Sequence, residues 1–240
     1  MLFRERLLSI MDRKNHWAWP VFSGPNIDKA QLRIHFQQEY ATYVRDFPVL
    51  LARIHGRNPP ASVRRMLAEN IYEEETGGLS FGTSHPELFL RMMEALGLRR
   101  ADFEQVALLP AARTYRNWLE RMTAAQDWVR AAATMAIFVE GSINDRREVI
   151  APARKKTARE IENAVRSHPL VRHHGVSPQS MDLTRAHQIV ESGHRRDAYA
   201  MVTAGVGGAR HQQAVIACLE RTLSLWLRYR DGVARACGVA

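Results

Sequence analysis

The sequence contains little cysteine, little lysine and no long apolar run, and each of these absences excludes a class of protein. Its two cysteines, Cys218 and Cys237, are too few for a disulfide framework or a cysteine zinc site, so we expect reduced thiols. A run of about 18 apolar residues is missing, which excludes a membrane span. The first residues lack the continuous apolar core of a targeting segment, and we therefore expect a cytoplasmic protein.

The charge balance is basic, but the basic residues are not concentrated on one element. Only four of the 34 Lys and Arg residues are lysines, and the formal net charge is +9. The densest basic run, Arg154-Lys155-Lys156, is short, whereas nucleic-acid modules gather basic charge beside aromatic residues or glycines. We therefore expect no nucleic-acid partner.

Signals for β-strands are nearly absent, and helical periodicity covers most of the 240 residues. Ser84 and Glu87 have the spacing of a capping box at the start of one helix. The pattern predicts one all-α domain over residues 1–240, a bundle of about seven to eight helices. After a first segment ending before residue 15, the expected helices are about 28–54 with a bend near Pro48, 61–76, 85–96, 109–122, 124–141, 145–167, 180–202 and 208–236.

One of these helices carries histidines and a carboxylate on its apolar face. His187, Glu191 and His194 share a stripe with Leu183 and Met201. A buried charge without a partner costs several kcal/mol, so these groups need one. A metal ion suits neutral imidazole and carboxylate together, while a helix surface with a Glu–His hydrogen bond is the alternative interpretation.

Two other helices add Glu140, Glu74 and the nearby His85. Glu140 follows a segment that is apolar nearly all round and therefore central; alternatively, it marks the helix end. In the run Glu73-Glu74-Glu75, helical periodicity predicts that Glu74 points inward while its two neighbours flank it. A solvated acidic helix terminus is the other interpretation of this run.

Carboxylates and imidazoles on facing helices, without metal-binding cysteines, are typical of a non-haem di-iron or di-manganese centre in a helical bundle. Glu191 and His194 have the Glu-x-x-His spacing of ferritin-like bundles, but Glu74 has no histidine three residues later. The bundle is therefore not the ordinary ferritin-like one. The predicted metal ligands are Glu74, His85, Glu140, His187, Glu191 and His194.

Five motifs follow one another along the chain: Phe47-Pro48, the segment 69–75, His85-Pro86-Glu87-Leu88-Phe89, Phe138-Val139-Glu140-Gly141 and His187-x3-Glu191-x2-His194. With these motifs, the chain resembles the haem-oxygenase-like di-iron oxidases and oxygenases from about residue 31 to 220. This helical superfamily also holds the thiaminase-II-like and pyrroloquinoline-quinone-synthase-like proteins. In the last motif, the family has Asp where this chain has Glu191.

The resemblance implies that the six residues bind two Fe(II) ions and that O₂ is the co-substrate. O₂ would bind between the two ions and give a peroxo-bridged iron pair. Glu39, which shares a helix face with His35 and Tyr43, is a candidate further ligand or substrate contact. The metal-binding core is expected over about 31–220.

Two reactions are compatible with the resemblance. One is N-oxygenation of an amine or guanidine nitrogen in specialised metabolism, which the extra histidine, His187, favours. The other is oxidative C–C cleavage of an amino acid or a fatty acid. We expect a small-molecule substrate. Two questions stay open, namely whether the protein needs an electron donor and whether it forms a homodimer. A metal-free helical binding protein is the alternative from another class.

Overall fold

The computed structural model describes residues 2–150 and 154–239, apart from the side chains of residues 191–194. This part of the chain forms helices and no strands, which confirms the all-α prediction. Two segments, η1 (Tyr40–Val44) and η3 (Ala133–Val139), are π-helical, and η2 (Arg100–Phe103) and η4 (Pro178–Ser180) are short 3₁₀ turns. The α-helices are α1 (Phe3–Met11), α2 (Trp19–Phe22), α3 (Lys29–Glu39), α4 (Phe47–His55), α5 (Ala61–Thr76), α6 (His85–Ala95), α7 (Pro110–Ala124), α8 (Trp128–Ala132), α9 (Asp145–Ile150), α10 (Ala158–Ser167), α11 (Pro169–His174), α12 (Asp182–Gly205) and α13 (Ala209–Ala236).

The described residues form thirteen α-helices, so the prediction of seven to eight helices is wrong. Three long helices expected from periodicity are each divided. The region 28–54 becomes α3, η1 and α4, and Pro48 lies in the first turn of α4, where its missing N–H costs no hydrogen bond. The region 124–141 becomes α8 and η3, while 145–167 becomes α9 and α10, with residues 151–153 outside the described part.

The start of α6 also differs from the predicted capping box. Ser84 precedes the helix, but its side chain caps no backbone N–H group. The Glu87 carboxylate instead accepts two hydrogen bonds from the Arg100 guanidinium, at 2.6 and 2.9 Å. Bidentate charge-assisted bonds of this kind are stronger than neutral ones, which explains the choice of partner.

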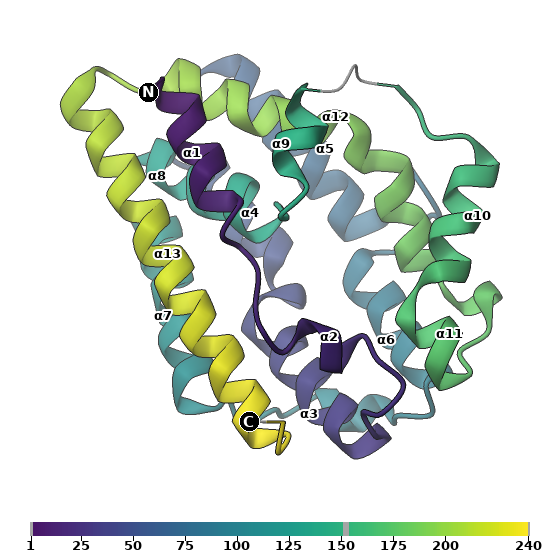
Figure 1. Ribbon diagram of the computed structural model, residues 1–240. Helices are drawn as coiled ribbons and strands as arrows, with labels where there is room; N and C mark the ends of the chain where they lie inside the picture. Colours follow the sequence, from purple (N-terminus) through teal and green to yellow (C-terminus); the bar gives the residue numbers. More distant parts are fainter. Residues whose placement is uncertain (1, 151–153, 240) are drawn as a thin grey trace.

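The core joins helices from both ends of the chain. α13, yellow in Figure 1, packs along α7 and also contacts α1, α3 and η3, while α12 contacts α6, α8, η3 and α10. Leu7, Leu51, Leu119 and Leu219, one each from α1, α4, α7 and α13, are fully buried in a common cluster. Among the described helices, none combines the length and the apolar character needed to cross a membrane.

The two π-helical segments border the region in which the predicted ligands lie. Glu39 immediately precedes η1, and Glu140 immediately follows η3. A π turn holds more residues than an α turn, so it rotates the side chains that follow it, and such segments are frequent at functional sites. A prediction that assumes regular α-helical periodicity therefore assigns the wrong direction to side chains on one side of Glu39 and of Glu140.

Candidate metal centre

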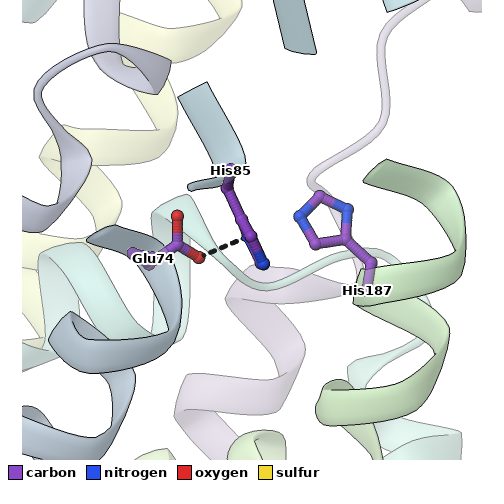
Figure 2. Close-up of side chains that lie close together, drawn as sticks. All are labelled: Glu74, His85 and His187. Atoms are coloured by element: carbon purple, nitrogen blue, oxygen red, sulfur yellow. Dashed lines mark ion pairs between the residues drawn. The ribbon is translucent and has the colours of Figure 1, made fainter. Parts of the chain in front are cut away.

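Glu74, His85 and His187 come together from α5, α6 and α12 (Figure 2). One ligand atom from each residue lies within 4.8 Å of the other two. The two imidazole rings are 5.0 Å apart between centroids and nearly perpendicular, at 72°. Since α6 packs against both α5 and α12, the group is assembled by helix packing and not by closeness in the sequence.

Glu73 and Glu74 contact different nitrogens of the same His85 ring. Glu73 Oε1 lies 3.1 Å from Nε2, and Glu74 Oε1 lies 3.0 Å from Nδ1. The Glu73 side chain is only 1% exposed and the Glu74 side chain 14%, and both residues line a cavity. The prediction that Glu73 merely flanks the site is therefore wrong, and of the three glutamates only Glu75 is largely exposed to solvent.

The three-residue group has the chemistry of a metal site. His85 Nδ1 is buried and has no hydrogen-bond partner within the described residues, because its contact with Glu74 lacks hydrogen-bond geometry. An unpaired buried nitrogen costs free energy that a bound cation would recover. Burial and the nearby His85 lower the pKa of His187 to about 4, so this ring is neutral at pH 7 and has a lone pair to donate. Two imidazoles and a carboxylate suit iron or a similar divalent metal.

A cavity of about 340 Å³ adjoins the group and contains further predicted residues. Glu140 lines it but lies outside the three-residue group, and Asn70 donates a hydrogen bond to Glu140 Oε1. Arg195, which sequence patterns did not single out, lines it as well. The apolar wall consists of Phe36, Val44, Phe47, Phe89, Met92, Val139, Leu183 and Val190.

Glu39 also lines the cavity, but it is held by the protein itself. Arg230 Nη2 lies 3.3 Å from Oε1, His35 Nε2 lies 3.3 Å from Oε2, and the Tyr43 hydroxyl donates to Oε1. Burial raises the pKa of Glu39, but the Arg230 charge, His35 and the Tyr43 hydrogen bond together outweigh this effect and lower the pKa to about 2. Glu39 is therefore ionised, and its oxygens are directed to these partners instead of to the three-residue group.

Glu191 and His194 lie on α12, about one and two helical turns beyond His187. Their side chains lie outside the described residues. Their role as ligands therefore stays a prediction.

Lys14 is a further residue near the site that sequence reasoning missed. Its ammonium group donates to the carbonyl oxygens of Phe138 and Gly141, at 2.5 Å each, on either side of Glu140. Burial and the charge of Arg195 lower the pKa of Lys14 to about 7. Since its acceptors are 124 and 127 positions away in the chain, no local pattern marks Lys14.

Solved structures with the same arrangement of helices share little sequence with this chain. A domain of unknown function from Shewanella denitrificans, described as having a haem-oxygenase-like fold, superimposes with a TM-score of 0.68 at 17% identity, over 97% of this chain and 90% of that one. A TenA homologue from Pseudomonas syringae gives a TM-score of 0.66 at 13% identity, over 97% and 88%. These similarities establish the haem-oxygenase-like fold.

Curated proteins named 4-aminobenzoate synthase are similar over part of the chain. The protein from Chlamydia muridarum is 26% identical over 125 residues, 49% of this chain and 51% of that protein. The protein from Chlamydia trachomatis is also 26% identical over 125 residues, 49% of this chain and 52% of its own length. The matched part of the chain thus spans about half the length of these relatives.

A family model described as an iron-containing redox enzyme matches residues 34–227. This range contains every predicted ligand together with Glu39, and it covers most of the chain. The chain therefore belongs to this family of iron-containing redox enzymes.

Proposed function

We propose that the chain is a non-haem di-iron oxygenase that uses O₂ to oxygenate an amine or guanidine nitrogen of a small metabolite. The observation that carries this proposal is the meeting of Glu74, His85 and His187 at the wall of a 340 Å³ cavity. These three residues would hold one iron ion. A second ion would need Glu140 together with Glu191 and His194. Bound iron supplies the activation of O₂, and the protein supplies ligands, orientation and a dry pocket.

The cavity wall supports a substrate with an apolar body and a basic nitrogen. Phe36, Phe47 and Phe89 line it, and aromatic faces attract cations as well as apolar groups. The curated relatives are named as synthases of 4-aminobenzoate, an aromatic amine, which supports a small nitrogen-containing compound in the reaction of this chain.

The overall reaction requires an electron donor. Insertion of one oxygen atom from O₂ into an N–H bond, with reduction of the other atom to water, consumes two electrons and two protons. Neither comes from the substrate, so we expect an external reductant. The stoichiometry of the proposed reaction is therefore the reason to expect an electron donor.

Iron loading and product analysis test the proposal together. We expect about two irons per chain after anaerobic loading with Fe(II), since the six predicted ligands suit two such ions. The loaded protein, given ¹⁸O₂ and a reductant, is then offered separate amines, guanidines, amino acids and fatty acids. An ¹⁸O label on nitrogen in the product is the expected result.

Oxidative C–C cleavage of an amino acid or fatty acid is the second candidate. Arg195 lines the cavity and favours it, because a guanidinium binds a substrate carboxylate well. A product that has lost carbon without gaining oxygen on nitrogen would replace the first proposal by this one. Failure to take up iron would instead favour a metal-free helical binding protein.

A further inference from the structure

Glu73 contacts the Nε2 edge of the His85 ring, and both of its carboxylate oxygens are engaged. Oε2 accepts a hydrogen bond from the Leu79 backbone N–H at 2.7 Å. Oε1 accepts from the Ser80 hydroxyl and lies 3.1 Å from His85 Nε2. Glu73 lines the same cavity as the three-residue group, but both of its oxygens are already occupied by contacts with Leu79, Ser80 and His85.

The loop between α5 and α6 builds this arrangement. Gly77 ends α5 with a φ of +61°, in the left-handed region that favours glycine. Its carbonyl oxygen accepts a hydrogen bond from Ser80 N–H at 2.9 Å. The chain thereby turns back over the helix end, which brings Leu79 and Ser80 to the Glu73 carboxylate before α6 starts at His85.

The two nitrogens of His85 therefore have different surroundings. Nε2 faces a carboxylate that is fixed by the loop, whereas Nδ1 is buried beside Glu74 without a hydrogen bond among the described residues. A neutral imidazole has one N–H and one lone pair. When the Nε2–H group donates a hydrogen bond to Glu73, the lone pair is left on Nδ1, on the side of Glu74.

We propose that Glu73 is a positioning residue that makes Nδ1 the metal-binding nitrogen of His85. A carboxylate partner fixes the tautomer and the ring orientation of a ligating histidine and increases its basicity. Such partners typically contribute about 10–100-fold to metal affinity. This inference rests on the metal site of the proposed function and is independent of its reaction class.

Zinc binding to the whole chain tests the inference without any oxygen chemistry. Affinity is measured by competition with a chelator for wild type, Glu73→Gln and Glu75→Gln. We expect Glu73→Gln to bind zinc about 10–100-fold more weakly, because a neutral amide is a poorer acceptor for the imidazole N–H. Glu75→Gln, an exposed position on the same helix end, is the matched control and should bind as wild type.

A ¹⁵N NMR spectrum of the zinc-loaded wild type reads the His85 tautomer directly, with resonances assigned through His85→Gln. We expect a protonated Nε2 and a metal-bound Nδ1. This measurement needs no Glu73 variant, so it tests which nitrogen binds the metal even if Glu73→Gln fails to fold. Ser80→Ala, which keeps the carboxylate but removes one of its donors, should give a smaller loss of affinity than Glu73→Gln.

Zinc bound through Nε2 would overturn the proposal, as would a Glu73→Gln protein with wild-type affinity. A further outcome against it is that X-ray absorption shows one zinc ligand fewer in Glu73→Gln, since Glu73 would then be a ligand itself. The proposed function fails separately, through lack of oxygenated product from iron-loaded protein. The two failures are therefore distinguishable.

Discussion

Arg230 on α13 and Glu39 at the end of α3 form an ion pair at the cavity wall, with Nη2 3.3 Å from Oε1. The guanidinium carbon also lies 4.6 Å from the centre of the Trp19 ring, and Nη2 lies 3.1 Å from the Tyr43 hydroxyl. The Arg230 side chain is 4% exposed, so it depends on these partners and not on bulk solvent.

Replacing Arg230 by Met should lower the free energy of unfolding by about 3–5 kcal/mol, because it leaves the Glu39 charge buried without its main partner. Urea denaturation measures this loss. The double variant Arg230→Met/Glu39→Gln should recover part of the stability, since it removes both charges. A double variant that is no more stable than Arg230→Met would show that the ion pair is not the cause.

Glu140→Ala should reduce the iron content from about two ions to about one per chain, because Glu74, His85 and His187 form a group without Glu140. Iron analysis after anaerobic loading checks the result. Glu104→Ala, which removes an exposed carboxylate, is the control. Full iron occupancy in the Glu140→Ala protein would contradict its assignment as a ligand.

Ionised Asp127 should stabilise the folded protein, and this contribution to the free energy of unfolding should be lost in acid. Its carboxylate accepts from the Arg130 backbone N–H at 3.2 Å and lies 3.1 Å from His211 Nε2. Burial raises its pKa, but these contacts outweigh burial and hold the pKa below its ordinary value. The unfolded chain therefore takes up the proton at higher pH than the folded chain. The stabilisation is full above the ordinary pKa and is lost as pH falls through the folded-state pKa.

Asp127 is the N-cap residue of α8, and asparagine is also a good N-cap residue, so Asp127→Asn isolates the charge effect. We expect urea unfolding of Asp127→Asn to depend less on pH than that of wild type between neutral pH and about pH 3. An equally steep loss of stability in acid would assign the pH dependence to other groups.

Gly141→Ala should destabilise the protein by about 1–3 kcal/mol through overpacking. A Cβ atom there would overlap the Ile137 carbonyl oxygen and would lie 2.6 Å from both Asp145 Oδ2 and Met11 Cε. Gly207→Ala is the control, because the nearest atom to its Cβ would be His211 Nδ1, at 3.8 Å. Thermal unfolding of the two variants should differ clearly, and equal stability would mean that the Gly141 turn can relax.

Local sequence patterns are sufficient to predict the helical class and the positions of most of the helices. Apolar periodicity and a Pro–Gly pattern are local, so they predict α5, α7, α12 and α13 closely. The placement of acids and histidines on apolar faces also directed attention to Glu74, His85, Glu140 and His187, which the structure brings to one cavity. A polar side chain at an apolar position of a helical repeat can be recognised from the sequence alone.

The packing of the helices and loops, in contrast, is needed to see which glutamate contacts which His85 nitrogen and which cationic side chains lie near the site. Glu73 and Glu74 are neighbours in the same acidic run, and only the returning loop at Leu79 and Ser80 distinguishes them. Lys14 and Arg230 come from opposite ends of the chain to carbonyl and carboxylate groups far away in sequence. The π-helical segments depend on this packing as well, because the extra residue in a turn is stabilised by its surroundings and has no periodicity of its own.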